Sequence, residues 1–507
     1  MFRPPGYMVL VQAIGFLCLG VVLLSGRSMA ESPPIPSEAT NPTPISESSQ
    51  VPLTTESVLD HSRILPDLPL ENLDIHTPPA KLSAYPPLPP NGVMGQFSKS
   101  IDHYSNNPEP PDWLAPYLSV RLRGKGTLRA YGFVRGDYAM ATQRFQDLQF
   151  PQWVLPNDSR YVIGPNKIPI TTDDGFNYNT FAKITRLGLE YFHQPSGLIE
   201  GGRVWGRIEA DFLNNQTDTS LPFNQPSRPY LRLRLAYLGI GYGDWDFVMG
   251  QDWDIFSPLL PIVQAGTQMA YAGNTGDRRP CAYLNYDHDF GDGNRIQFQN
   301  GIALANAIDQ ADLNFDGQRG NEAYGLPGFE SRLGFVLPTA VEKQPLMFGV
   351  SGVMADDYSG TGIGKSGART FPQRALAGDL RFPIHERITI QAECYAGYNL
   401  NEWRGGVGQG INPIEGKVIR AMGGWTEVVA QSCDYHRCSL GMGVDKANGS
   451  DVNELGRTRN MVYWARNELL LDPSVILGCE YFYWSTMYKG LNSGNANLIQ
   501  FFAQLNF

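Results

Sequence analysis

Arginine residues that alternate with apolar residues are the feature of this sequence with the clearest chemistry. In the segment LRLRLAYLGIGY, Arg232 and Arg234 alternate with leucines. A guanidinium group stays charged at any working pH and binds carboxylate or phosphate oxygens through two parallel hydrogen bonds. These side chains therefore predict recognition of anions rather than catalysis. The arginines that alternation places on polar strand faces are Arg186, Arg207, Arg232, Arg234, Arg332 and Arg466.

Acidic residues share these polar faces and leave the charge balance open. Glu190, Glu209, Asp211 and Glu393 occupy alternating positions like those of the arginines. If the arginines outweigh the acids along a passage, the passage attracts anions. If the two signs balance across it, the result is a transverse field with little selectivity. The sequence is compatible with both interpretations.

The charged residues lie on short segments whose apolar residues recur with a period of two, the pattern of strands with one apolar face. Connections between these segments alternate between short, such as GYGD and DFGDG, and long, such as residues 140–182 and 253–279. Alternating loop lengths are typical of outer-membrane barrels and are not expected of a soluble β-sandwich. We expect about sixteen strands. They lie near residues 127–139, 183–193, 202–213, 229–240, 245–252, 280–288, 294–304, 329–337, 345–355, 373–382, 386–397, 416–430, 437–445, 457–470, 474–485 and 496–507.

The alternation also predicts which strand faces meet lipid. Leu233, Leu235 and Tyr237 fall on the face opposite Arg234. An arginine or lysine at the middle of a bilayer costs about 2–4 kcal/mol, so the charged faces must point into the lumen. The sequence therefore predicts an all-β, transmembrane antiparallel barrel whose water-filled pore is lined by these arginines and acids.

Three regions follow one another along the chain. Residues 1–30 combine Arg3, an apolar run, and the small residues Ser28 and Ala30, which predict a signal peptide cleaved after Ala30. An uncleaved anchor helix is the alternative. Residues 31–120 are rich in proline, serine and threonine, which predicts a disordered, flexible linker rather than a coiled-coil stalk. Residues 121–507 form the barrel, which we expect in the outer membrane of a double-membraned bacterium, surrounded by lipid.

The C-terminal segment LIQFFAQLNF alternates apolar and polar residues up to Phe507. A lone strand would leave an open edge there, whereas the last strand of a barrel pairs with the first. A terminal strand that ends in phenylalanine also resembles the signal read by the outer-membrane barrel assembly machinery, which we expect as a partner.

Motifs along the barrel region resemble those of the DcaP-like outer-membrane porins. They are, in order, LRAYGFVRGDY, TRLGLEYF, GRIEADF, LRLRLAYLGIGYGDWDFVMGQDWDIF, NTGDRRP and QAECYAGYNL. The resemblance covers roughly residues 121–507. It implies a trimer of sixteen-stranded barrels that passes small, mostly anionic solutes such as dicarboxylates. It also implies that the third long connection folds inward as a constriction, which adds Arg278 and Arg279 to the pore lining.

The resemblance leaves alternatives and one departure. The phosphate-selective porins share a similar architecture, and a general, non-selective porin is a further alternative. The N-terminal coiled coil usual in the DcaP-like porins is not visible in this sequence. Small residues on the first strands, Ala130, Gly132 and Gly136, favour contact between barrels, although relief of barrel curvature would also explain them.

Other classes of function find less support. A net charge of −10 gives no case for nucleic-acid binding. No serine or cysteine lies in a recognisable triad, which argues against a barrel enzyme, and no cofactor is expected. Asp312, Asn314 and Asp316 have the spacing of a calcium loop, but Ala323 stands where its last acidic ligand belongs. A weak calcium site and an Asx-rich turn both remain open.

Two cysteines bracket one of the short turns. Cys433 and Cys438 flank the residues DYHR. A hairpin of this length can bring their Cα atoms within about 4.4–6.8 Å, as a disulfide requires, and the periplasm is oxidising. We expect a disulfide there, with two free thiols as the alternative.

Overall fold

The structure is a computed structural model. It describes residues 119–122, 126–163, 168–169, 175–193, 195–213, 230–263, 268–305, 307, 326–341 and 344–507. The predicted signal peptide (1–30), the predicted linker up to residue 118, and the candidate calcium loop with Asp312, Asn314 and Asp316 lie outside these residues. No helix in the described part of the chain is long and apolar enough to cross a membrane.

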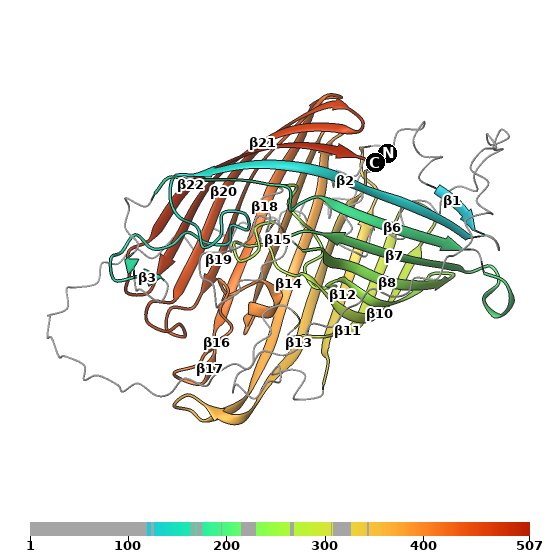
Figure 1. Cartoon of the computed structure of the whole chain (residues 1–507). Helices are drawn as coiled ribbons and strands as arrows, with labels where there is room; N and C mark the ends of the chain where they lie inside the picture. Colours follow the sequence, from blue (N-terminus) through green and yellow to red (C-terminus); the bar gives the residue numbers. More distant parts are fainter. Residues whose placement is uncertain are drawn as a thin grey trace, which may run out of the picture. The chain divides into compact units, whose positions relative to one another are not determined.

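The described chain forms one closed antiparallel sheet, shown in Figure 1. The sheet has eighteen strands. β1 pairs with β2 on the same edge as β22, and β5 pairs with β2 on the same edge as β6, so each pair counts as one position and sixteen positions surround the barrel. The last strand pairs with the first, for example at Leu505 opposite Val134. The predicted all-β barrel and its number of strands are confirmed. The sixteen are β2 (Gly126–Ala141), β6 (Arg186–His193), β7 (Arg203–Asp211), β8 (Arg232–Tyr242), β9 (Trp245–Trp253), β10 (Arg278–Asp289), β11 (Arg295–Ala303), β12 (Gly328–Leu337), β13 (Leu346–Ile363), β14 (Ala368–His385), β15 (Ile388–Tyr398), β18 (Arg420–Cys433), β19 (His436–Ala447), β20 (Arg457–Asp472), β21 (Val475–Tyr488) and β22 (Gly494–Asn506).

Short elements complete the edges and loops. β1 (Ser119–Leu122) lies beside β2 on the edge that continues with β22, and β5 (Asn177–Phe181) lies on the edge shared with β6. β5 and β6 therefore act as one strand, broken at residues 182–185. The sequence did not predict the small loop elements. These are the pair β3 (Val162–Ile163) and β4 (Ile168–Pro169), the pair β16 (Ile411–Asn412) and β17 (Lys417–Val418), and the 3-10 turns η2 (Gly197–Ile199) and η3 (Asn401–Trp403).

The barrel closes where the C-terminal residue meets Gly132. The backbone N–H of Gly132 donates to the carbonyl of Phe507, and that of Phe507 donates to the carbonyl of Gly132, both at 3.0 Å. Gly132 has a φ of +155°, and a Cβ there would lie 2.3 Å from the carbonyl oxygen of Arg186. Only glycine fits this position. The expected pairing of the terminal strand with the first is therefore confirmed.

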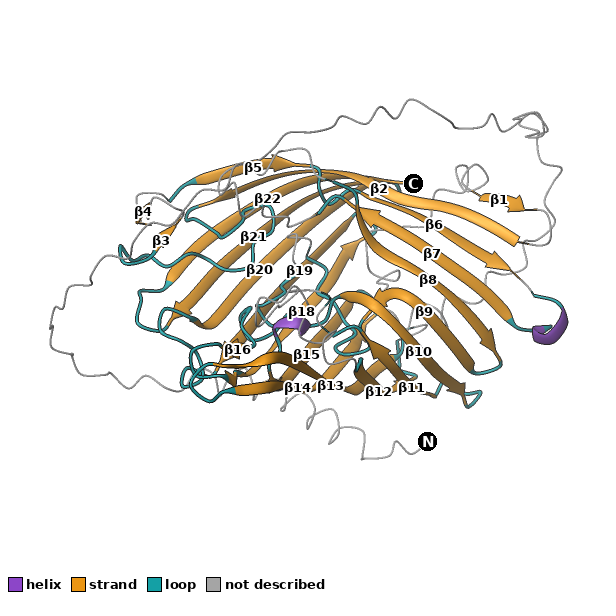
Figure 2. Cartoon of the chain, turned by 60° about the horizontal axis from the view of Figure 1, so that its bottom comes forward, coloured by secondary structure: helices purple, strands orange, loops and turns teal. Residues whose placement is uncertain are grey.

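Connections alternate in length as predicted, except that residues 364–367 and 489–493 form short connections at the end that carries the long loops. At one end, strands are joined through residues 243–244, 386–387, 434–435 and 473–474, whereas residues 254–277 and 399–419 form long loops at the other end. In Figure 2 several loops lie within the ring of strands, whereas the loop between β6 and β7 projects beyond it. The hairpin of β13 and β14 projects beyond its neighbours at the lower edge of Figure 1.

The exterior is apolar and the interior is polar, as the alternation predicts. Leu187, Leu189 and Ile208 are exposed by 44%, 45% and 57%, whereas Glu190 and Glu209 on the same strands are buried. An apolar exterior suits contact with lipid acyl chains.

The predicted facing is wrong for Leu235 and Tyr237. A β-bulge between β7 and β8 leaves Arg234 as an extra residue on β8, which reverses the alternation beyond it. Leu235 is therefore 2% exposed and packs against Trp253 inside the barrel, while Leu238 faces outward with 51% exposure.

Loops pack into the interior against one wall of the barrel. One buried apolar cluster joins two long loops to the barrel. It contains Phe145 and Val154 from the loop after β2, called the first loop, and Val263 and Met269 from residues 254–277, called the third loop. Side chains of β18, β20, β21 and β22, including Trp484, complete it. Burial of this apolar area fixes the loops to that wall. The charged residues described next lie on β6, β7 and β8, which follow β22 and β2 around the barrel.

Candidate functional site in the barrel lumen

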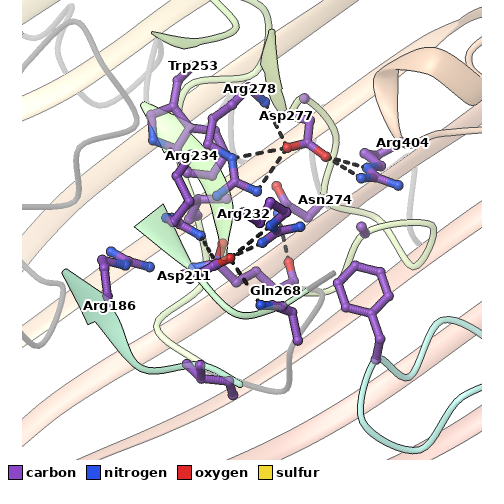
Figure 3. A pocket seen from close by; sticks show the side chains of 16 residues that line it. Arg186, Asp211, Arg232, Arg234, Trp253, Gln268, Asn274, Asp277, Arg278 and Arg404 are labelled. Atoms are coloured by element: carbon purple, nitrogen blue, oxygen red, sulfur yellow. Dashed lines mark hydrogen bonds and ion pairs between the residues drawn. The ribbon is translucent and has the colours of Figure 1, made fainter. Parts of the chain in front are cut away.

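Five arginine side chains from distant parts of the chain converge on one pocket (Figure 3). Arg186, Arg232 and Arg278 are the first residues of β6, β8 and β10, and Arg234 follows within β8. In an antiparallel barrel alternate strands start at the same end, so these residues meet at the end that carries the long loops. Arg404 joins them from the loop that follows η3.

Acidic residues of β7 hold three of these arginines. Arg232 donates to both carboxylate oxygens of Asp211, at 2.9 and 2.8 Å, and Arg234 donates to the same carboxylate at 2.9 Å. Arg234 also donates to Glu209 at 2.6 Å, and Nε of Arg186 lies 3.4 Å from that carboxylate. Paired, charge-assisted bonds of this kind fix the planes of the guanidinium groups.

Asp277, at the end of the third loop, binds the remaining two arginines of the pocket, Arg278 and Arg404. Nε of Arg404 donates to Oδ2 of Asp277 at 2.6 Å, and Nη2 of Arg278 donates to Oδ1 at 3.1 Å. Burial acts to raise the pKa of Asp277, but the neighbouring Arg404 and Arg278 hold that pKa well below its usual value. Asp277 is therefore ionised at working pH and holds residues 254–277 against the loop that carries Arg404.

The pocket carries an excess of positive charge. Its lining contains five arginines and two aspartates, which gives 5 − 2 = +3. The side chains of Arg232, Arg404 and Arg186 are 26%, 15% and 14% exposed, so part of each remains accessible. The cavity itself has a volume of about 40 Å³ and is open to solvent on one side. The other lining residues are Phe150, Ile184, Leu213, Trp253, Leu260, Gln268, Ala270, Asn274 and Gly276.

A second layer of charge continues along the same wall toward the short turns. Glu190 accepts a hydrogen bond from Nε of Arg129 at 3.0 Å and forms an ion pair with Arg207. The hydroxyl of Tyr131 donates to Glu209 at 2.9 Å and so joins this layer to the pocket. Two arginines share the one carboxylate of Glu190, so the arginine excess extends below the pocket.

Glu393, which we expected to line the pore, instead anchors the third loop. Ser257 Oγ and the backbone N–H of Leu259, both in that loop, donate to its carboxylate at 2.7 and 2.6 Å. Nε1 of Trp425 donates a third bond at 3.0 Å. The side chain is buried beneath the loop and is not available to a passing solute.

Two further inward carboxylates hold the same loop. Glu330 accepts a bond from the backbone N–H of Phe256, and Glu427 accepts one from the backbone N–H of Ile262, each at 2.9 Å. Arg466 donates to the carbonyl of Ile262 at 2.6 Å. Strands β12, β15, β18 and β20 thus bind successive residues of the loop, which confirms that the third loop folds into the lumen.

Three arginines expected to line the pore are enclosed in ion pairs. Their side chains are at most 3% exposed, so they hold the barrel wall and loops rather than face solvent. The pairs are Arg279 with Asp254, Arg332 with Asp379, and Arg466 with Glu480, at 2.6, 2.7 and 2.5 Å.

Sequence reasoning missed four residues of this arrangement. Glu330 and Glu427 lie on inward strand positions, so the alternation that found Glu393 could have found them as well. Asp277 and Arg404 lie in irregular loops, where no period assigns a face.

The predicted disulfide is absent, because Cys433 and Cys438 are free thiols. Cys433 lies opposite His436 and Cys438 lies opposite Ala430, so the two cysteines are not cross-strand partners. In the described ranges, no group of three or more histidine, cysteine, aspartate or glutamate side chains is arranged to hold a metal ion.

A closed sixteen-stranded barrel with an apolar exterior, a charged interior and inward loops has the fold of an outer-membrane porin. The crystal structure of the outer-membrane channel DcaP of Acinetobacter baumannii matches it with a TM-score of 0.56 and 17% identity, over 76% of this chain and 99% of that chain. Looser matches are an anion-selective porin from Comamonas acidovorans (TM-score 0.46, 10% identity, 76% and 100% covered) and OprB of Pseudomonas putida (0.45, 10%, 74% and 94%). No protein-family model and no curated protein matches the sequence.

Proposed function

We propose that this protein is a porin of the bacterial outer membrane that lets small hydrophilic anions diffuse passively through an arginine-lined lumen. The observation that carries this proposal is the +3 excess in the pocket where the third loop and the loop bearing Arg404 meet. This excess is local and opposes the net charge of −10 of the whole chain. Charges more than about 8 Å apart are largely screened at physiological ionic strength, so a passing solute responds mainly to the pocket.

The free hydrogen-bonding capacity of the pocket favours carboxylates. The guanidinium groups of Arg232, Arg404 and Arg186 are partly exposed and can bond the oxygens of a passing carboxylate. Because several such groups lie together, a second carboxylate of the same solute would also find a partner. Small dicarboxylates are therefore the proposed solute class. Phosphate or unselective passage is the alternative, and liposome swelling with sugars, dicarboxylates and phosphate distinguishes them.

Reversal potentials in planar bilayers under a potassium chloride gradient test the anion preference. We expect the unmodified porin to favour chloride, and the double variant Arg232→Gln/Arg278→Gln to move the potential toward zero. The matched control is Lys365→Gln/Arg420→Gln, which removes two cations whose side chains are 71% and 61% exposed, away from the pocket. A preference of the unmodified porin for potassium would refute the proposal.

We also propose that the porin is a homotrimer. We further propose that the outer-membrane barrel assembly machinery recognises its last strand, which ends at Phe507. Gly132 is required by barrel closure, but Gly136 on the same outer face has no atom within 4 Å of the place where its Cβ would lie. Its lack of a side chain has no cause within the barrel and suits a neighbouring barrel.

Native mass measurement in mild detergent tests the trimer. Gly136→Leu should reduce the mass from three barrels to one. The control Gly378→Leu, which adds the same side chain on the outer face of β14, should leave the mass unchanged. A single-barrel mass of the unmodified protein in several detergents would defeat the trimer.

A further inference from the structure

Lys183 is a buried lysine whose ammonium group has no partner in the described part of the chain. It lies in the break between β5 and β6 and is 4% exposed. Its backbone carbonyl accepts a bond from Phe212, but within the described residues its ammonium group makes no hydrogen bond or ion pair. An ammonium group that has lost most of its contact with bulk water gains from a partner, and charges in protein interiors are normally paired.

A pocket of about 340 Å³ lies beside this lysine. Thr180, Phe181 and Thr185 line it together with Lys183 and Gln149. Oε1 of Gln149 is also buried and accepts no hydrogen bond from any residue that the structure describes. The two ends of a glutamine amide exchange places by a simple flip, so Gln149 can present its N–H₂ group to the pocket.

The nearest acid does not fill the gap. Asp147 acts on Lys183 electrostatically, but its Oδ1 accepts the backbone N–H of Gln149 at 2.8 Å and makes no ion pair with the lysine. The pocket therefore brings together a cation and an amide that both lack a partner among the described residues.

We propose that this pocket binds an anionic oxygen group, a phosphate or a carboxylate, through an ion pair with Lys183 and a hydrogen bond from Gln149. An ammonium group offers three donors to such oxygens, and the volume accommodates a small oxyanion or a lipid headgroup. The site lies apart from the arginine pocket, whose lining includes the next residue, Ile184, but not Lys183. It goes beyond the proposed passage of solutes through the lumen.

Thermal unfolding of the purified barrel with three probes tests the site. The probes are inorganic phosphate, succinate, and detergent micelles containing phosphatidylglycerol. At least one should raise the Tm to saturation, because a ligand that binds only the folded state stabilises it. Lys183→Met should lose this rise, whereas Lys365→Met, which removes an exposed lysine, should keep it. A rise with phosphate or succinate identifies a free solute, and a rise with phosphatidylglycerol alone identifies a lipid headgroup.

Two further variants separate this site from the pore and from a purely structural role. The variant Arg232→Gln/Arg278→Gln should keep the part of the rise that depends on Lys183. Without added anion, Lys183→Met should unfold at the same or a higher temperature than the unmodified protein, because it removes an unpaired charge and keeps the stem. Gln149→Leu should weaken the rise. Equal titrations of the unmodified protein, Lys183→Met and Gln149→Leu with all three probes would overturn the proposal.

Discussion

The anchoring of the third loop by Glu393 predicts that this buried carboxylate sets the open area of the pore. Glu393→Ala removes the acceptor for Ser257 and Leu259 and leaves the N–H of Leu259 without a partner. Hydrogen bonds to a charged group contribute about 1.5–3 kcal/mol each, so the loss of two amounts to roughly 3–6 kcal/mol of loop docking. The loop remains tied through Glu330 and Glu427. We therefore expect the segment between these two ties to leave the wall part of the time.

Single-channel recording in planar bilayers measures this release. Glu393→Ala should show added open-channel noise and discrete conductance steps, because a loose loop changes the open area while the barrel stays intact. Glu393→Gln keeps one acceptor oxygen and the shape of the side chain, so its effect should be smaller. Glu454→Ala is the control, since that carboxylate is 73% exposed and pairs with Lys489. If Glu393→Ala folds normally and its conductance and noise equal those of the control, the reasoning is refuted.

Three other predictions follow from closure, from the lipid face and from the loop contact. Gly132→Ala should prevent closure, because its Cβ would meet the carbonyl oxygen of Arg186 at 2.3 Å; loss of the heat-resistant folded band on gels would show this. Leu238→Arg places a cation on the outer face and should cost about 2–4 kcal/mol if the site lies near the bilayer midplane, measured by urea unfolding in lipid vesicles. The pair of Asp277 and Arg404 should stabilise the loops fully above the ordinary aspartate pKa of about 4 and lose this contribution as the pH falls toward the lowered pKa of Asp277. The difference in conductance between the unmodified porin and Asp277→Asn should accordingly be constant from neutral pH to about pH 5 and shrink only below about pH 4; a difference that disappears near pH 6 would contradict this role for the pair.

The strands were predictable from the sequence because one physical constraint acts on every one of them. Lipid outside and water inside force a period of two, and the expected segments fall on all sixteen barrel strands. Leu235 shows where this reasoning fails. A bulge inserts one residue that the amino-acid sequence does not reveal. The alternation in the sequence then continues unchanged, while in the structure the side chains beyond the bulge point to the other face of the sheet.

The site was harder to predict than the strands, because a period assigns a face but not a partner. Arg232 and Glu393 both lie on inward faces, yet one lines the pocket and the other lies beneath the third loop. The difference depends on the path of residues 254–277, which have no period of their own. The same lack of a period concealed Arg404, whose contact with Asp277 joins two loops far apart in the sequence.

The position of the loop decides how the inward charges should be counted. Judged by strand faces alone, the inward carboxylates offset the arginines and leave the sign of the lumen open. Glu330, Glu393 and Glu427 lie beneath the loop, where its backbone N–H groups bond to them, so a solute in the lumen does not contact these carboxylates. Arg279, Arg332 and Arg466 are withdrawn in the same way by their ion pairs. On the proposed function, a solute meets the arginine pocket, whose lining has five guanidinium groups and two carboxylates, and we expect this excess to favour anions even in a chain whose total charge is negative.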